Sequence, residues 1–117
     1  MTKPIGPYSP VVRAGDLLFV SGQVGVVDGR MVSGGVESET RQALTNLEAV
    51  LATVGASLAD VVKTTVFLRH MRDFGLMNDV YAEVLGDNRP ARSTVAVVEL
   101  PAVALVEIEA VALKPGL

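Results

Sequence analysis

One arginine and two glutamates in the last third of the sequence have side chains that could carry out chemistry together. Arg92 stands near the start of an apolar stretch, and Glu107 and Glu109 alternate with apolar residues in the next one. A guanidinium offers a fork of donors that matches a carboxylate, so Arg92 could hold an organic acid. A glutamate that is partly removed from water beside a second acid has a raised pKa and could exchange a proton with water.

Whether these side chains meet depends on how two predicted strands pair. Arg92–Val98 and Ala104–Leu113 are joined by few residues, too few for a crossover, which predicts an antiparallel hairpin. With a loop at Glu99–Ala102, Arg92 would oppose Glu109.

In this register the charged side chains share one face of the sheet. Thr94 opposes Glu107, and alternation places both beside Arg92 and Glu109, on the side that no helix covers. The other face is apolar and is expected to lie under helices; it comprises Val95, Val97, Val106, Ile108 and Ala110. A shift of one residue would separate Arg92 from the glutamates. Two interpretations stay open: a carboxylate clamp, or a structural ion-pair cluster in which Arg92 neutralises the glutamates.

Five further residues could contribute polar groups to a site, and each also has a structural explanation. Ser21 and Gly22 end an apolar run and could present backbone amides to a ligand, or form a plain turn. Tyr8 follows a rigid turn, where its phenol could line a pocket or simply pack. The favoured interpretations of Asn78 and His70 are a solvated helix amide and a surface residue.

The elements that would hold these residues are short strands and amphipathic helices. Apolar residues recur every three or four positions in two segments, which predicts helices at 36–54 and 74–84, ended by Gly55 and Gly86. Runs of apolar and β-branched residues predict strands at Val11–Arg13, Leu17–Ser21, Val61–Arg69, Arg92–Val98 and Ala104–Leu113, with a further short strand near Arg30–Val32. The order β-β-(β)-α-β-α-β-β predicts an α+β fold, with a mixed sheet and two helices on one face. Another subunit is expected to bury the uncovered face.

The composition narrows the class of protein. The chain of 117 residues is predicted to form a single domain over residues 1–117. Its mean hydropathy of +0.43 is high for a small domain and again indicates a subunit interface. No apolar run is long enough to span a bilayer, and the first residues lack the apolar core of a signal peptide. The expectation is therefore a cytoplasmic protein that does not bind membranes.

Metal and nucleic-acid binding are not expected either. The sequence has no cysteine and one histidine, which leaves little material for a metal site. The net charge is -3 and the isoelectric point is about 5.0, with lysines and arginines scattered among acids. A protein that binds a phosphate backbone would instead present a basic patch.

Six motifs occur in order from about Ile5 to Leu113: IGPYSP, LLFVSGQV, TRQALTNLEAVLATVGASLADVVKTTVFL, MNDVYAEVLG, RPARSTVAVVELP and VEIEAVAL. As a set they resemble the RidA/YjgF family of reactive-intermediate deaminases, formerly labelled endoribonuclease or translation inhibitor proteins. The resemblance implies a chorismate-mutase-like fold in which three subunits form a barrel of sheets with ligand clefts between them. It also implies hydrolysis of 2-imino acids and their enamine tautomers, such as 2-aminoacrylate (2-iminopropanoate) and 2-iminobutanoate. The products would be 2-keto acids and ammonia, and no metal or organic cofactor would be needed.

The resemblance also implies roles for individual residues. Arg92, in the PARS motif, would bind the substrate carboxylate, and Glu107, in EIEA, would activate the attacking water. Residues expected to line the pocket are Tyr8, Ser21, Gly22, Asn78 and Thr94, with Glu109 in a supporting role. Three positions depart from the family pattern, because Thr94 replaces a frequent cysteine, Gly25 a proline and Arg89 an aromatic residue. Thr94 is expected to act mainly through its backbone amide, whereas the other two changes concern the shape of the pocket.

Two other functions remain as alternatives. A non-catalytic trimer that senses small carboxylate metabolites would use the same Arg92 and would show binding without turnover. RNA cleavage, which the older family label suggests, is disfavoured because the chain is acidic and has neither a histidine pair nor a basic stripe.

Overall fold

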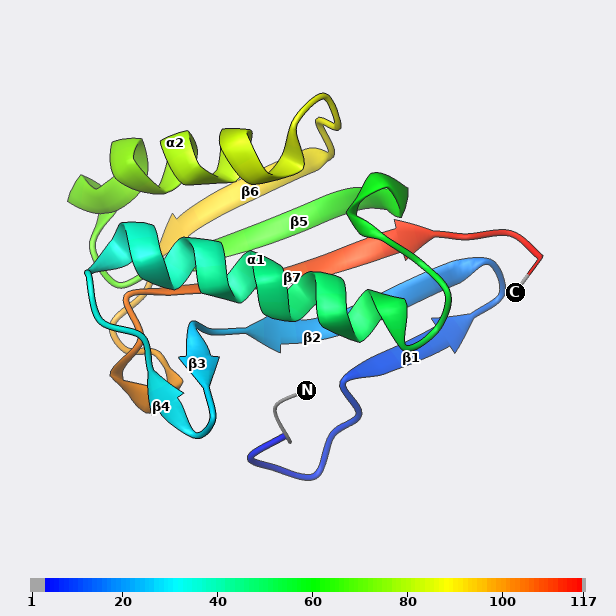
Figure 1. Cartoon of the computed structure of the whole chain (residues 1–117), viewed down its shortest axis with the longest axis horizontal. Coiled ribbons are helices and arrows are strands. Elements are labelled where there is room, and N and C mark those ends of the chain that lie inside the picture. Colours follow the sequence, from blue (N-terminus) through cyan, green and yellow to red (C-terminus); the bar gives the residue numbers. More distant parts are fainter. Residues whose placement is uncertain (1–3, 117) are drawn as a thin grey trace.

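The computed structural model describes residues 4–116, which form a mixed β-sheet with two helices on one face (Figure 1). The sheet has the strand order β1-β2-β7-β5-β6. Its strands are β1 (Val11–Ala14), β2 (Leu17–Gln23), β5 (Val61–Leu68), β6 (Ala91–Ala96) and β7 (Val106–Leu113). The short strands β3 (Val26–Val27) and β4 (Arg30–Met31) form a separate hairpin. The predicted α+β class and the extra short strand are confirmed.

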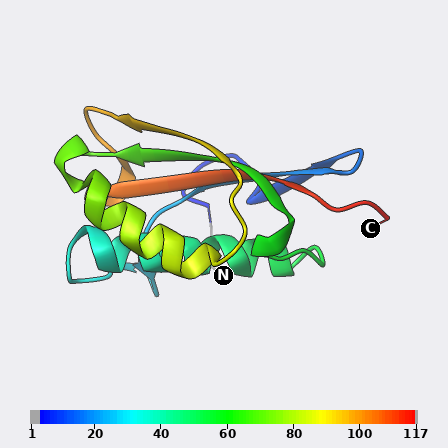
Figure 2. The same cartoon turned by 90° about the horizontal axis from the view of Figure 1, so that it is seen from above.

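Both helices lie on the same side of the sheet, as the view from above shows (Figure 2). They are α1 (Val36–Ala52) and α2 (Phe74–Leu85), and each buries the apolar stripe that the sequence spacing predicted. Fully buried side chains from the helices and the sheet meet in one core, which includes Leu18, Leu44, Leu47, Leu51, Val66, Leu68, Met77, Val106 and Ile108. None of the helices in residues 4–116 is long and apolar enough to cross a membrane.

The pairing of the last two strands differs from the sequence-based prediction. β6 pairs in parallel with β5, and β5 pairs antiparallel with β7, so that β5 lies between the two strands expected to form a hairpin. The connection spans residues 97–105 and contains a 3-10 turn at Pro101–Val103. It is longer than the predicted loop at Glu99–Ala102, and it can therefore pass across one intervening strand. The predicted hairpin and its register are wrong.

The strand order also changes the face on which each charged residue lies. Arg92 in β6 pairs with Thr64 in β5, and Thr64 is buried beneath the helices. Glu107 in β7 pairs with Phe67 in β5. Because strand residues alternate, Phe67 and Glu107 lie on the face opposite to that of Thr64 and Arg92. Glu109 lies on the same face as Glu107. Arg92 and the two glutamates were expected on one face, and the structure places them on opposite faces.

The face without helices, which we call the open face, exposes large apolar side chains. These are Val12, Leu17, Phe19, Val95 and Leu113. Val95 was expected beneath the helices but is 42% exposed, because its strand pairs with β5 in the register Phe67 to Val95. Val97 lies beyond the end of β6, whereas Val106, Ile108 and Ala110 are buried as expected.

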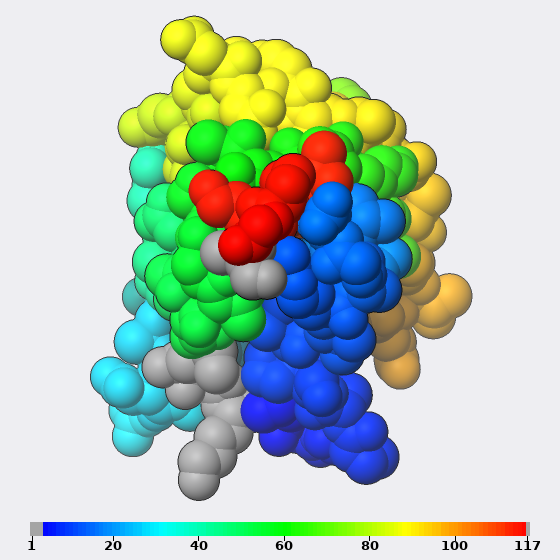
Figure 3. Space-filling view, turned by 90° about the vertical axis from the view of Figure 1, so that its right-hand side faces the viewer, coloured from blue at the N-terminus to red at the C-terminus, as the bar shows by residue number. Residues whose placement is uncertain are grey.

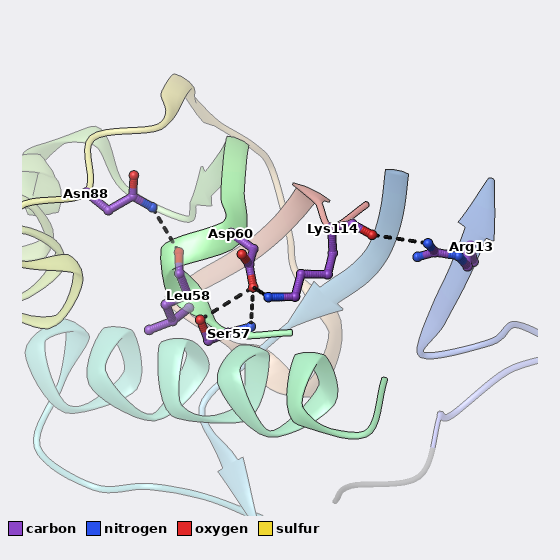
Figure 4. Close-up of polar contacts among 6 residues, drawn as sticks. All are labelled: Arg13, Ser57, Leu58, Asp60, Asn88 and Lys114. Carbon is purple, nitrogen blue, oxygen red and sulfur yellow. Dashed lines mark hydrogen bonds and ion pairs between the residues drawn. The ribbon is translucent and has the colours of Figure 1, made fainter. Parts of the chain in front are cut away.

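The end of β7 is fixed by polar contacts to the turn between β1 and β2, which Gly15 makes at a φ of 62°. The backbone N–H of Lys114 donates to the carbonyl of Asp16 over 2.9 Å, and Arg13 Nη2 donates to the carbonyl of Lys114 over 3.1 Å. Lys114 Nζ lies 3.7 Å from Asp60 Oδ2 (Figure 4). Figure 3 shows the C-terminal segment, in red, seated between the blue β1–β2 strands and the green segment that precedes β5. These contacts hold the end of β7 that is remote from Glu107.

Candidate active site

Glu107 lies directly against the backbone of β2 at Gly22. The register between β2 and β7 shifts around Gly22, which has no partner residue in β7. A Cβ atom at Gly22 would lie only 2.8 Å from Glu107 Cδ, so the absence of a side chain makes room for the carboxylate. Partial burial raises the pKa of Glu107, and the nearby charge of Glu109 raises it further. A raised pKa brings a carboxyl closer to the range in which it can exchange protons with water at neutral pH.

A cavity of about 660 Å³ opens beside Glu107. Its walls come from the N-terminal segment, the end of β2, the β3–β4 hairpin, α1 and the 3-10 turn before β7. Tyr8 and Gly22 line it together with Glu107. A smaller cavity of about 350 Å³ is lined by Tyr8, Ser21 and Glu109, among others. Tyr8 thus lines both cavities.

Ser21 holds the segment that carries Tyr8. Its hydroxyl donates a hydrogen bond to the carbonyl of Ser9 over 2.7 Å, and its backbone N–H donates to the carbonyl of Pro10 over 2.9 Å. Both contacts tie the chain just after Tyr8 to β2. The side chain of Ser21 is therefore engaged in positioning the pocket wall.

Arg92 lies beneath α2 between two aromatic rings. Its Cζ atom lies 4.8 Å from the centre of the Tyr81 ring and 5.5 Å from that of Phe74. Tyr81 is fixed in turn by a buried hydrogen bond of 2.7 Å between its hydroxyl and Thr64 Oγ1. Among residues 4–116, no carboxylate lies within 4.0 Å of the Arg92 guanidinium. The structural ion-pair cluster of Arg92 with Glu107 and Glu109 therefore does not form within one copy of the chain, where the charge of Arg92 remains available to a ligand.

Two buried polar atoms near Arg92 lack hydrogen-bond partners within residues 4–116: Asn78 Oδ1 and Thr94 Oγ1. Thr94 follows Arg92 by two residues and shares its face of β6. Asn78 lies between Phe74 and Tyr81 on one face of α2, since helix residues three and four apart are neighbours. The sequence favoured a solvated or helix-end amide for Asn78; in the structure the residue is half-buried and its Oδ1 atom is removed from solvent. An unpaired buried polar atom costs free energy, so both atoms are suited to a polar group of a ligand.

The expected site residues thus fall into two groups. The carboxylate group comprises Glu107, Gly22, Tyr8 and Ser21 around the open end of β2, and the arginine group comprises Arg92, Asn78 and Thr94 beneath α2. The two groups lie on opposite faces of the sheet, so one copy of the chain does not bring them together around a small ligand. No cluster of three or more His, Cys, Asp or Glu side chains that could hold a metal ion occurs in residues 4–116.

Sequence reasoning missed a buried carboxylate that contacts the chain just before β7. Glu39 on α1 is only 5% exposed, and its Oε1 accepts a hydrogen bond of 2.8 Å from the backbone N–H of Leu105. Burial raises the pKa of Glu39, the Leu105 hydrogen bond lowers it in part, and Asp73 raises it. Leu105 precedes Glu107 by two residues, so the contact fixes the entry of β7. No signal in the sequence separates Glu39 from the solvated acids of an amphipathic helix.

Asn46 lines the cavity without having been predicted to do so, and Gly25, where an effect on pocket shape was expected, lies in the segment that Asn46 holds. Asn46 Nδ2 donates to the carbonyls of Val24 and Val26, which follow the end of β2. A Cβ atom at Gly25 would lie 2.8 Å from Glu39 Cα, so Gly25 permits close packing of this segment on α1. The replacement of a proline by Gly25 therefore coincides with a position that has no room for a side chain.

Proteins of one family match this chain over almost its whole length. The sequence model of the family described as Endoribonuclease L-PSP matches residues 1–114. A RutC family protein of Pyrococcus horikoshii is 49% identical over 114 residues, covering 96% of this chain and 90% of that protein. A 2-iminobutanoate/2-iminopropanoate deaminase of Dermatophagoides farinae is 47% identical over 111 residues, covering 93% of this chain and 87% of that protein.

Solved structures of related proteins have the same fold as this chain. A crystal structure from Thermotoga maritima has a TM-score of 0.92 at 49% identity and covers 97% of this chain and 91% of that chain. The structure of Escherichia coli TdcF with bound serine has a TM-score of 0.88 at 35% identity, with coverage of 95% and 90%. The α+β, chorismate-mutase-like fold expected from the resemblance is confirmed. With a family model and relatives that match almost its whole length, this chain belongs to the RidA/YjgF (RutC, L-PSP) family.

Proposed function

We propose that this protein hydrolyses reactive 2-imino acids and their enamine tautomers, such as 2-iminopropanoate and 2-iminobutanoate, to 2-keto acids and ammonia. Relatives named as deaminases of these two compounds support the substrate class. The bound serine of the TdcF structure is a small amino acid, which presents a carboxylate and a nitrogen on neighbouring carbons as a 2-imino acid does.

The observation that carries the proposal is the unpaired charge of Arg92. A partly buried guanidinium held between the Tyr81 and Phe74 rings, with no carboxylate within 4.0 Å in the described chain, is suited to bind a carboxylate from outside. A substrate carboxylate would replace the missing partner. Asn78 Oδ1 could accept a hydrogen bond from the imine N–H, and the Thr94 hydroxyl could donate to the substrate carboxylate.

The proposed site is completed by a second copy of the chain. Arg92 lies under α2 and Glu107 lies on the open face, so the pocket would combine the arginine group of one copy with the carboxylate group of its neighbour. The family resemblance implies a homotrimer with three such pockets. The apolar side chains exposed on the open face fit this assembly, because a neighbouring sheet would bury them.

In the proposed reaction, Glu107 acts as the general base and then as the general acid. Its carboxylate accepts a proton from a water molecule as the water oxygen bonds to C2 of the imine, and the C=N bond becomes a single bond. The proton on Glu107 then passes to the nitrogen, which gives a 2-amino-2-hydroxy acid. Glu107 next takes the proton of the C2 hydroxyl and passes it to the nitrogen, so that the C–N bond breaks and ammonia leaves as the C2 carbonyl forms. When Arg92 binds the substrate carboxylate, C2 is held near that water molecule. The two reactants then do not have to meet by diffusion, as they do in the uncatalysed reaction, and the entropic part of the barrier is lower.

A dehydratase-coupled assay tests the proposal. Threonine or serine dehydratase would generate the imine, and the rate of 2-keto acid formation would be followed with and without the purified protein. We expect the protein to accelerate the hydrolysis, Arg92→Ala to abolish the acceleration, and Arg41→Ala to retain it, since Arg41 is an exposed arginine of α1 that pairs with Glu83 and lines neither cavity. A wild-type protein that adds nothing to the rate would refute the proposal. Binding of a 2-keto acid by that inactive protein, measured by calorimetry, would then favour the carboxylate-sensing alternative.

A further inference from the structure

We propose that the cavity beside Glu107 receives the side chain of the substrate, so that the protein prefers 2-imino acids with a bulky apolar side chain, such as those derived from leucine or phenylalanine, over 2-iminopropanoate. This inference rests on the proposed function and specifies the substrate class of the same site. It follows from the charge, the hydrogen bonding and the size of the cavity.

The charges in the cavity wall determine which part of the substrate can enter it. Glu107 and Asp28 both line the cavity, and no lysine or arginine among residues 4–116 does. A substrate carboxylate would be repelled there and is instead matched by Arg92. With the carboxylate at Arg92 and C2 near Glu107, the remaining substituent of C2 is the side chain, and the cavity is the space beyond it.

The hydrogen bonding of the wall leaves an apolar lining. Asn46 Nδ2 donates to the carbonyls of Val24 and Val26 over 2.9 and 3.0 Å, and Asn46 Oδ1 accepts from Gln42 Nε2 over 2.9 Å. The amide of Asn46 is thus already engaged within the protein and does not require a polar ligand group. Much of the remaining wall is apolar, with side chains from Ile5, Val24, Val26, Val27, Pro101 and Ala102. Such a surface favours an apolar group, because transferring it from water is favourable.

The size of the cavity exceeds what the smallest substrates need. A volume of about 660 Å³ lies within the range of roughly 300–1,000 Å³ that holds drug-sized ligands. The methyl group of 2-iminopropanoate would leave most of this space to water, whereas an isobutyl or benzyl group would displace water from the apolar wall. Each additional buried carbon should therefore increase kcat/KM until the space is filled.

The first experiment compares substrates of increasing size. An L-amino acid oxidase, with catalase to remove peroxide, would generate the 2-imino acids of alanine, leucine and phenylalanine, and 2-keto acid formation would give kcat/KM for each. We expect kcat/KM for the leucine-derived imine to exceed that for 2-iminopropanoate at least about tenfold. Equal values, or a preference for 2-iminopropanoate, would overturn the proposal and leave the proposed function standing. No hydrolysis of any imine would overturn both.

The second experiment fills the cavity from α1. Ala49 is a solvent-accessible residue of α1 that lines the cavity, and Ala52 lies one turn further along the same helix and does not line it. Ala49→Trp is expected to lower the ratio of kcat/KM for the leucine-derived imine to that for 2-iminopropanoate by about tenfold. Ala52→Trp, the matched control, should leave the ratio as in the wild type.

The outcome is decided by the ratio of the two substrates. If Ala49→Trp and Ala52→Trp change it equally, or if neither changes it, the side chain does not occupy the cavity and the proposal is wrong. Should Ala49→Trp fail to fold, Thr45→Leu gives a smaller increase in volume at another accessible position of the same wall. That variant must lower the ratio in the same direction for the proposal to stand.

Discussion

Glu107 combines partial burial with a neighbouring acid, and both features raise the pKa of its carboxyl. The proposed reaction requires the ionised form of Glu107, so its rate should fall as the pH falls through this raised pKa. The acid limb of the pH profile should therefore lie above the pH at which an ordinary glutamate protonates. A substitution at Glu109 tests whether the ionisation of Glu107 sets this acid limb.

Glu109→Gln is expected to move the acid limb of kcat/KM to lower pH. Removing the negative charge of Glu109 lowers the pKa of Glu107, which then stays ionised in more acidic solution. The measurement is kcat/KM against pH for the wild type and the variant. Glu48→Gln, an exposed acid of α1, removes the same charge elsewhere and should leave the limb in place. A limb that Glu109→Gln does not move, or moves to higher pH, would contradict the assignment of the base.

Gly22→Ala is expected to reduce kcat by more than about tenfold, because its Cβ would displace the Glu107 carboxylate. Gly75→Ala is the matched control, since its Cβ would meet no atom within 4 Å and alanine is favoured in a helix. Activity and thermal unfolding would be measured for both variants. Wild-type activity in Gly22→Ala would show that the close packing of Gly22 on Glu107 has no part in catalysis.

At the scale of the elements, the sequence predicted most of the fold but not the order of the last strands. Spacing identified α1 and α2 because each helix buries a single apolar stripe, and runs of apolar and β-branched residues identified each strand of the main sheet. The prediction of a C-terminal hairpin failed because strands that follow one another in the sequence need not be neighbours in the sheet. Residues 102 and 103 adopt positive φ values in the connection, a conformation that their side chains do not favour and that the sequence therefore does not indicate.

The candidate site could be predicted only in part, for a related reason. Arg92 and Glu107 can be recognised in the sequence as charged residues among apolar neighbours. The face of the sheet on which each side chain lies depends on the strand order, which the sequence did not predict. Glu39 and Asn46 were missed because their importance comes from tertiary contacts with Leu105 and with the carbonyls after β2. An isolated helix pattern contains no information on those contacts.

The contact between α1 and β7 at Glu39 gives a stability prediction. Glu39→Leu should be about 1–3 kcal/mol less stable than Glu39→Gln, because only glutamine keeps an acceptor for the N–H of Leu105. The raised pKa of Glu39 means that ionisation opposes folding, so its favourable contribution is present at low pH and is lost as the pH rises through the raised pKa.

Glu39→Gln should consequently be more stable than the wild type at pH 7, and this difference should disappear below the ordinary pKa of 4.5. Urea unfolding at both pH values measures the free energy of unfolding of the wild type and both variants. If Glu39→Leu is as stable as Glu39→Gln, the Leu105 hydrogen bond does not contribute to stability.

At the scale of the whole molecule, the two groups of site residues lie on opposite faces of one sheet. The proposed assembly would account for both their separation and the apolar open face, because each copy would contribute Arg92 to one pocket and Glu107 to another. In such a head-to-tail ring, a copy that lacks one residue can still complete a pocket with the other residue.

Mixing two inactive variants tests this account most directly. Arg92→Ala and Glu107→Gln, each inactive alone, would be unfolded together in equal amounts, refolded, and assayed for hydrolysis of 2-iminobutanoate. Random assembly pairs an intact Arg92 with an intact Glu107 in about a quarter of the pockets, so we predict about a quarter of wild-type activity. A mixture of Arg92→Ala with the double variant should stay inactive. If the first mixture is no more active than its components, although wild-type protein refolded in the same way is active, the shared site is contradicted.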